Sequence, residues 1–315
     1  MLETGPQCGS IPEPGTDLTP LLAQDRCAAR RTLTRRGFFR LAAGFGAAAL
    51  IADSIAFEPN RPQLVRREIS LRRWPAQLDG FTIALLSDFH YDPYFSVHPL
   101  RAAIPMVNAL HPDLVALTGD FVSIPMMHRY SRTAAFAAEP CASLLRELRA
   151  PHGLWAVLGN HDEFTDPELV TSILHSTGIP VLANQSVPIE LNGSRFWLGG
   201  VNDVMGGSSD LDRTLGNVPP AEPVVLLAHE PDYADFAASH PIDLQLSGHS
   251  HGGQIRVPFL PPLYEPPLAR KYVAGLYHVG PLTLYTNRGL GTVGVPLRFD
   301  CPPEVTLLTL RHAGA

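Results

Sequence analysis

The stretch Phe81–His90, FTIALLSDFH, sets an apolar run directly before a polar cluster that contains Asp88 and His90. Four later apolar runs are likewise followed by polar residues: Leu114–Leu117, Leu154–Leu158, Val224–Leu227 and Leu244–Leu246. Short apolar runs without alternation are typical of strands that are covered on both faces. Because ligands bind at the carboxyl ends of strands in α/β sheets, we expect all five polar clusters to converge on one crevice.

The segments between these runs predict an α/β fold. Helical spacing is present in Leu100–Ala109, Cys141–Leu148 and Pro167–His175, the last with proline at a plausible first turn. Further strands are expected at Ile179–Leu182, Val187–Leu191 and Phe196–Val201, the last two joined by the hairpin turn Asn192-Gly193. Strand–helix alternation predicts parallel βαβ units in the first half, and the more β-rich second half predicts mixed pairing.

Composition excludes several classes of function. The 315 residues contain 24 Lys+Arg and 30 Asp+Glu, a net charge of −6, which argues against nucleic-acid binding through a basic face. Lys271 is the single lysine, and no surrounding motif indicates a lysine nucleophile. Cys8 and Cys27 lie in the leader; Cys141 and Cys301 could pair in an oxidising compartment, but two buried thiols are the simpler interpretation.

The N-terminal segment has the features of an export signal. Residues 1–33 are rich in proline, glycine and small polar residues, and we predict a disordered tail there. Thr34–Arg40, TRRGFFR, resembles a twin-arginine signal, and the uncharged run Leu41–Ala52 is shorter than the roughly 20 residues of a membrane span. Ser54-Ile55-Ala56 would permit cleavage before Phe57. We therefore divide the chain into a leader (1–56) and a domain (57–315), and leave open whether the leader is removed or kept as a tether.

The polar clusters carry side chains that suit a pair of metal ions. Asp88 and His90 are two residues apart, as are His249 and His251, so on extended chain each pair would point to one side and hold one cation. There are seven candidate ligands in all: Asp88, His90, Asp120, Asn160, His229, His249 and His251. One metal cannot use seven side chains and keep an open position, whereas two can if Asp120 bridges them. Nitrogen and oxygen ligands without thiolate suit Mn, Zn, Fe or Co.

These motifs, in this order, resemble those of the calcineurin-like metallophosphoesterases over about residues 80–255. The sequences Arg288–Gly291 and Arg298–Glu304 further resemble the bacterial twin-arginine-exported phosphodiesterase branch, which is related to lipid-directed members that cleave UDP-diacylglucosamine. The resemblance implies a fold of two mixed β-sheets packed as a sandwich and flanked by helices.

The resemblance also implies the roles of individual residues. Asp120 would be shared between two metal sites. The first site would contain Asp88, His90, Asp120 and His251; the second would contain Asp120, Asn160, His229 and His249. A hydroxide between the two divalent ions would attack phosphorus without a covalent intermediate. His161 would act as general acid or stabilise the leaving group, with Asp162 orienting it.

Departures from other branches narrow the expected substrate. Purple acid phosphatases carry a tyrosine where this chain has Ser123, and protein Ser/Thr phosphatases usually lack the Gly-His-x-His ending present here. Both points favour a diester or pyrophosphate. Arg288 and Arg298 are expected either to clamp a phosphate or to form ion pairs elsewhere, and Asn202-Asp203 either to line the crevice or to form a turn.

The proline-rich segment Pro258–Pro267 has two interpretations: a stiff connection, or an apolar surface that receives an acyl chain or touches a membrane. In the second interpretation, Met126, Met127 and the stretch to Phe136 would form a second apolar wall. The leading hypothesis is an exported two-metal phosphodiesterase acting on a phospholipid-like or cell-envelope substrate, with the twin-arginine export machinery as a further partner. The alternatives are a phosphomonoesterase or nucleotide phosphatase, and a catalytically silent metal-binding scaffold. Oligomeric state is not predicted.

Overall fold

The computed structural model describes residues 34–125, 131–263 and 265–314, so the predicted tail 1–33 and the proposed wall at Met126 and Met127 lie outside the described residues. The chain divides into two compact units, one ending at Gly46 and the other spanning Ala47–Ala315. Helix α1 (Arg35–Ala52) is followed by a π-helical segment, Asp53–Phe57, and a 3₁₀ turn, Glu58–Asn60.

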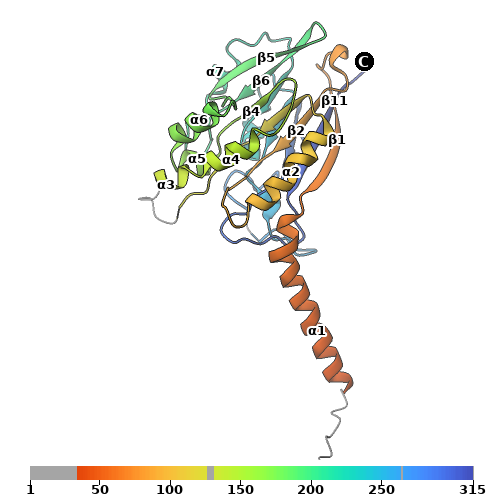
Figure 1. The fold of residues 1–315 in the computed structure, drawn as a ribbon. Coiled ribbons are helices and arrows are strands. Elements are labelled where there is room, and N and C mark those ends of the chain that lie inside the picture. The colour runs from red at the N-terminus through yellow and green to blue at the C-terminus, as the bar shows by residue number, and fades with distance from the viewer. Residues whose placement is uncertain (1–33, 126–130, 264, 315) are drawn as a thin grey trace, which may run out of the picture. The chain divides into compact units, whose positions relative to one another are not determined.

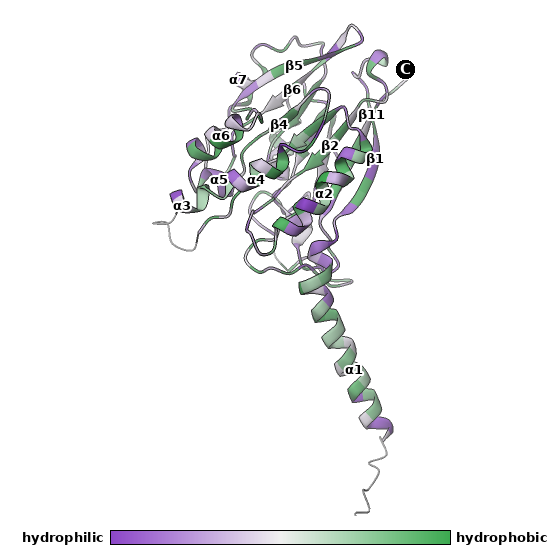
Figure 2. Cartoon of the chain, viewed as in Figure 1, coloured by the Kyte–Doolittle hydropathy of each residue, from purple (hydrophilic) through white to green (hydrophobic). Residues whose placement is uncertain are grey.

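The uncharged run Leu41–Ala52 predicts a segment too short to span a membrane. The helical stretch in the structure, Arg35–Asn60, is longer than this run. Among the described residues it is one helix that is long and apolar enough to cross a membrane by length and composition, a test that signal sequences near the N-terminus also pass. The hydrophobic colouring of α1 in Figure 2 follows from this composition.

The body, Ala47–Ala315, contains two mixed β-sheets (Figure 1). The first has the order β1 (Gln63–Leu71), β11 (Glu304–His312), β2 (Thr82–Leu86), β3 (Leu114–Leu117), β4 (Leu154–Ala156). The second has the order β5 (Gln185–Leu191), β6 (Ser194–Gly200), β7 (Val224–Leu227), β8 (Leu244–Ser247), β10 (Leu282–Thr286), β9 (Gly275–Val279). The expected sandwich of two mixed sheets is confirmed.

Parallel pairing places the chemistry at one end of each sheet. Strands β2, β3 and β4 are parallel neighbours in the first sheet, and β6, β7, β8 and β10 are parallel neighbours in the second. The antiparallel pairs are β11 with β2, β5 with β6, and β10 with β9. Because parallel strands end at a common edge, the loops after β2, β3, β4, β7 and β8 can meet.

Side chains on the two faces of a central strand belong to separate parts of the hydrophobic core. Ile83 and Leu85 of β2 pack between the sheets with Leu198, Leu227 and Leu246 of the second sheet. Full burial of one such side chain contributes about 1.5–3 kcal/mol. Ala84 and Leu86 of the same strand face the other way, toward helices on the outer side of the first sheet.

Helices cover the outer faces of both sheets. Those on the first sheet are α2 (Val97–Leu110), α4 (Ala138–Leu145) and α6 (Pro167–Ser176), with the short α3 (Ser131–Ala135) and α5 (Asn160–Glu163) nearby in sequence. On the second sheet, Leu226 and Leu284 pack with α7 (Leu211–Leu215) and α8 (Ala234–Ala237). Cys141 and Cys301 are both buried and free, so the interpretation as two buried thiols is confirmed.

One predicted strand is wrong. Ile179–Leu182 contributes a single bridge, Val181 with Ala156, because the chain turns away at Asn184, which has a left-handed φ of 52°. The Asn192-Gly193 turn is confirmed: both residues have positive φ, 54° and 72°, as a tight hairpin turn requires. Strands β1, β9, β10 and β11 were not predicted.

The buried Arg298 side chain holds the C-terminal loop together. Its guanidinium donates hydrogen bonds to the carbonyl oxygens of Gly291 (2.6 Å), Cys301 (3.0 Å), Arg288 (3.0 Å) and Gly289 (3.2 Å). Burial lowers the pKa of this guanidinium. Arg298 is therefore a structural residue, and neither of its two expected states, a phosphate clamp or an ion pair, is found among the described residues.

The segment after α1 is tied to the same loop. The Arg298 backbone N–H donates to the Ser54 carbonyl oxygen at 2.9 Å, and the Glu58 carboxylate accepts the backbone N–H groups of Asp300 (3.1 Å) and Cys301 (2.5 Å). Ser54 and Pro59 are buried. Residues on both sides of the predicted cleavage point at Phe57 thus belong to the folded body.

Arg298→Met is expected to destabilise the body by about 3–5 kcal/mol, because it leaves four carbonyl groups without their charged donor. Chemical denaturation followed by circular dichroism measures this change. Arg195→Met is the matched control, since Arg195 is an exposed partner of Glu222 and its loss should leave the denaturation midpoint nearly unchanged. Equal midpoints for both variants would contradict the structural role of Arg298.

Candidate metal centre

The loops that follow the strands bend sharply. Asp88, His90, Asp120, His249 and His251 all have left-handed φ values, between 40° and 66°. The expectation of extended chain at the two Asp/His and His/His pairs is therefore wrong. The bends are stabilised by ladder-like hydrogen bonds: the N–H of Asp88 donates to the Gly119 carbonyl (3.0 Å), and that of His90 to the Asp120 carbonyl (2.9 Å).

Two glycines let the loops of both sheets approach one another. A Cβ atom on Gly248 would lie 1.8 Å from Ser87 Oγ and 2.4 Å from an oxygen of Asp88. A Cβ on Gly159 would lie 2.3 Å from Asp120 Oδ1 and 2.7 Å from His229 Cε1. Glycine is the residue that avoids both collisions, so Gly159 and Gly248 allow the close approach of these loops.

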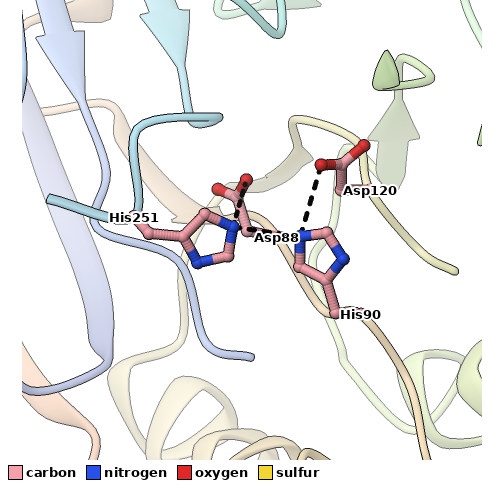
Figure 3. Close-up of side chains that lie close together, drawn as sticks. All are labelled: Asp88, His90, Asp120 and His251. Atoms are coloured by element: carbon pink, nitrogen blue, oxygen red, sulfur yellow. Dashed lines mark hydrogen bonds and ion pairs between the residues drawn. The ribbon is translucent and has the colours of Figure 1, made fainter. Parts of the chain in front are cut away.

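A first group of ligands consists of Asp88, His90, Asp120 and His251, all buried (Figure 3). His90 Nε2 lies 3.0 Å from His251 Nε2 and 3.3 Å from Asp120 Oδ2. His251 Nε2 lies 3.5 Å from Asp88 Oδ1. Figure 3 shows the four side chains converging from the loops that follow β2, β3 and β8. Two imidazole nitrogens so close to each other and to two carboxylates fit a cation between them.

A second group consists of Asp120, His229 and His249. His229 Nε2 lies 3.2 Å from the same Asp120 Oδ2 that faces His90, and the rings of His229 and His249 lie 4.9 Å apart. Asp120 thus belongs to both groups. Asp88 and His90 share one group, whereas His249 and His251 fall into different groups, so the expectation that His249 and His251 serve a single cation is wrong.

Asn160 lies beside the ligand groups in the same cavity. Its Oδ1 atom is buried and has no hydrogen-bond partner in the described part of the chain. It lines the same cavity as Asp120 and His249. A buried amide oxygen without a partner is costly, and a cation would satisfy it. The donor set of the two groups, imidazole nitrogens with carboxylate and amide oxygens, fits divalent transition metals.

Outer hydrogen bonds orient three of the histidines. His229 Nδ1 lies 2.6 Å from the Thr118 carbonyl, and His249 Nε2 lies 2.8 Å from the Pro267 carbonyl. A nitrogen that faces a carbonyl carries the proton, so each ring presents its other nitrogen as a lone pair for ligation. His90 Nδ1 lies 3.2 Å from Ser123 Oγ. No sequence motif points to Thr118 or Pro267, because both act through backbone carbonyls.

Mutual electrostatics keep the shared carboxylate charged. Burial alone would raise the pKa of Asp120, but the neighbouring His229 and His161, with hydrogen bonds from His229 and His90, hold it well below its usual range. Conversely, burial opposes the charging of His229, yet Asp120 raises the pKa of that imidazole well above its usual value. Burial lowers the pKa of His249 to about 4 and that of His251 well below normal, as ligands require.

His161 lies at the edge of the two groups. Its Nδ1 accepts the Ile124 backbone N–H at 2.9 Å, so the neutral ring carries its proton on Nε2. Burial lowers the pKa of His161 to about 4. The backbone N–H of His161 also donates to Asp120 Oδ1 at 2.9 Å. The ring is thus a neutral hydrogen-bond donor whose position depends on the shared carboxylate.

Asp162 supports the loop around His161 through the backbone. Its carboxylate accepts the N–H groups of Val122 (3.1 Å) and Gly159 (3.0 Å), which ties the loops after β3 and β4 together. Burial raises the pKa of Asp162 to about 7. Its hydrogen bonds therefore position the chain that carries His161 rather than the imidazole itself.

The remaining candidates lie away from the ligand groups. Arg288 Nε donates to Glu304 Oε2 at 2.6 Å, the ion pair that was one of its two expected states. The Asp203 carboxylate accepts the Gly206 N–H at 2.5 Å, as in a turn, and neither Asn202 nor Asp203 lines the catalytic cavity among the described residues.

A cavity of about 400 Å³ opens onto both ligand groups. Its polar floor contains Asp120, Asn160, His161, His249 and His251. Its walls are mainly apolar and contain Met205, Ile255, Leu263, Pro266, Pro267, Val293 and Val295, together with the polar Ser250 and Gln254. A phosphate group on this floor would therefore leave its substituents against apolar side chains.

Comparison with known proteins agrees with this geometry. Residues 81–253 match the family model of the calcineurin-like phosphoesterases. The uncharacterized metallophosphoesterase YkuE of Bacillus subtilis is 36% identical over 256 residues, which cover 81% of this chain and 87% of the relative. Phosphodiesterase YaeI of Escherichia coli is 34% identical over 291 residues, which cover 88% and 99% of the two chains.

A third relative is named for a lipid substrate. UDP-2,3-diacylglucosamine pyrophosphatase LpxG of Chlamydia muridarum is 29% identical over 312 residues, which cover 80% of this chain and 90% of the relative. The family model matches more than half of the chain, and two relatives with above 30% identity extend the match beyond it. The chain belongs to the calcineurin-like phosphoesterase family.

Proposed function

We propose that the protein is a two-metal phosphodiesterase that hydrolyses a phospholipid-like or cell-envelope diester outside the cytoplasmic membrane. The observation that carries this proposal is a pair of buried ligand groups sharing Asp120 at the floor of an apolar-walled cavity. Phosphodiesterase YaeI, which aligns over 99% of its own length, supports a diester rather than a monoester.

Seven side chains would hold the metals. Asp88, His90, Asp120 and His251 would form one site, and Asp120, Asn160, His229 and His249 the other. Two divalent ions, Mn, Zn, Fe or Co, would supply an acidified water and neutralise the charge of the phosphate.

The protein's own groups would then act on the substrate. His249 and His251, kept neutral by burial, would add no charge of their own to the site. His161, as a neutral donor with its proton on Nε2, would give a hydrogen bond to a phosphate or leaving-group oxygen. Asp162 would keep the loop of His161 in place.

The apolar cavity walls favour a lipid over a nucleotide. Ile255, Leu263, Val293 and Val295 offer no hydrogen-bonding side chain to a base or sugar, whereas they can cover an acyl chain at about 0.8 kcal/mol per buried CH₂. The likeness to LpxG, named for a diacylated substrate, supports the same class.

Export through the twin-arginine machinery is part of the proposal and rests on the Thr34–Arg40 motif. Retention of the leader as a tether is favoured by the contacts of Ser54 and Glu58 with the loop Arg298–Cys301, which cleavage before Phe57 would divide. Immunoblotting of cell fractions would then find the full-length chain in the membrane.

Purified protein is expected to hydrolyse bis(p-nitrophenyl) phosphate with Mn²⁺, to lose this activity with a chelator, and to cleave p-nitrophenyl phosphate more slowly. The reason is that the site would offer two metal ions and apolar walls, whereas its lining, as far as the structure describes it, contains no Arg or Lys for a second phosphate charge. Steady-state rates for the two esters measure this preference. Faster turnover of the monoester would favour the phosphomonoesterase alternative.

Asp120→Ala is expected to abolish the binding of both metals, whereas His229→Ala should remove one. Activity should fall by more than about 100-fold in each, since even changes to residues that merely support ligands cost about 10- to 100-fold. Elemental analysis gives the metal-to-protein ratio. The control His278→Ala removes an exposed histidine outside both groups. Full activity of Asp120→Ala would refute the two-metal site.

His161→Ala is expected to lower kcat by about 10²–10³-fold, as for the loss of a transition-state donor. His161→Asn keeps an N–H donor and should retain more activity. Because the pKa of His161 is about 4, the ring is neutral above that pH, and the pH–rate profile should show no step that the His161 variants remove between about pH 5 and 9. An imidazolium acid would instead give an alkaline limb that disappears in His161→Asn.

A further inference from the structure

Large apolar side chains are exposed beside the mouth of the catalytic cavity. Phe259 is fully exposed, and Leu260, Leu263 and Val295 each expose about half of their surface or more. Leu263 and Val295 also line the cavity. Large exposed apolar side chains that adjoin a cavity wall in this way are typical of a surface that binds a ligand, a partner or a membrane.

A second exposed apolar set lies where the helical stretch Arg35–Asn60 joins the body. Ile55 and Phe57 are about half exposed, and so is Phe95 at the start of α2. Ile55, Phe95 and Pro296 line one small hollow, and Pro296 directly follows Val295 at the cavity mouth. The two sets are therefore linked through the adjacent residues Val295 and Pro296.

The two apolar loops of this surface are held in place by Gln254. Its side-chain amide donates to the carbonyl oxygens of Val293 (3.0 Å) and Val295 (3.1 Å) and accepts the Val293 N–H (2.9 Å). A Cβ on Gly253 would lie 2.3 Å from Pro262 Cβ, so the proline-rich loop packs closely on the turn after His251. The exposed side chains are thus presented by an ordered framework and not by a free tail.

We propose that Ile55, Phe95, Phe259, Leu260, Leu263 and Val295 form a membrane-docking face that rests on the lipid bilayer. The occupant is a bilayer because the chain enters this surface directly from Arg35–Asn60, a stretch able by length and composition to cross a membrane. Tyr94, exposed beside Phe95, adds an aromatic ring of the kind enriched at membrane interfaces.

This face would bring the cavity mouth to the lipid surface. Leu263 and Val295 belong both to the face and to the cavity wall, so an acyl chain could pass from the bilayer to the wall without crossing water. The docking itself does not depend on the chemistry of the metal centre; the lipid route into the cavity rests on the proposed function.

Tryptophan fluorescence of the full-length protein in vesicles tests the docking. Phe259→Trp and the matched control Phe236→Trp, on α8, each place a tryptophan at an exposed phenylalanine. Each is reconstituted in phosphatidylcholine–phosphatidylglycerol vesicles with acyl chains brominated near the headgroup. After subtraction of the wild-type signal, the tryptophan at 259 should be quenched several-fold more than that at 236. Equal quenching, or none at 259, would overturn the proposal, including the case in which a second copy or another protein covers the face.

Activity gives a second, separable readout. Phe259→Asp combined with Leu260→Asp should lower hydrolysis of a phospholipid diester in the same vesicles by about tenfold or more, because charged side chains are costly at the interface. Hydrolysis of bis(p-nitrophenyl) phosphate should stay unchanged, since neither residue lines the cavity. If both activities fall alike, or neither falls, the docking face is wrong. Wild type that is inactive on both substrates would instead count against the proposed function, while the quenching result still decides the docking.

Discussion

The shared carboxylate of Asp120 is the constraint on which the site depends. One of its oxygens lies 3.3 Å from His90 and 3.2 Å from His229, and the other accepts the backbone N–H of His161 at 2.9 Å. These residues follow four different strands, so one buried charge links loops from both sheets. Transferring a charge from water to the protein interior costs free energy unless opposite charges and hydrogen bonds compensate for the lost hydration. Here imidazoles and a backbone N–H do so, and two cations would complete the compensation.

The fold meets this constraint by allowing the loops to come unusually close. Gly159 leaves room for Asp120 and His229, and Gly248 leaves room for Ser87 and Asp88. The backbone N–H of His249 then reaches the Asp88 carboxylate at 2.9 Å, which joins the two sheets at the metal centre. Farther from this contact, the Arg298 guanidinium donates hydrogen bonds to four carbonyl groups of the C-terminal loop. Gly289 of the same loop packs against Asp88.

The sequence predicts the local elements well and the long-range ones poorly. Strands Leu114–Leu117 and Val224–Leu227 are found at the predicted residues because uninterrupted apolar runs admit few other structures. The polar clusters after these strands also predict that the candidate ligands meet in one crevice. The premise of extended chain at Asp88–His90 fails because tertiary hydrogen bonds impose left-handed bends. Strand β11 pairs with β1 from the far end of the chain, a partnership without a local signal. The burial of Arg298 and the supporting carbonyls of Thr118 and Pro267 likewise appear only in three dimensions.

Electron paramagnetic resonance of the full-length protein titrated with Mn²⁺ tests the shared carboxylate most directly. If Asp120 bridges two ions, the spectrum at saturation should be that of a magnetically coupled pair, because a common ligand brings two Mn²⁺ ions within about 4 Å. The six-line signal of isolated Mn²⁺ ions should appear only after the sites are full and free Mn²⁺ is in excess. A protein that binds Mn²⁺ tightly but shows uncoupled signals at every ratio would contradict the account.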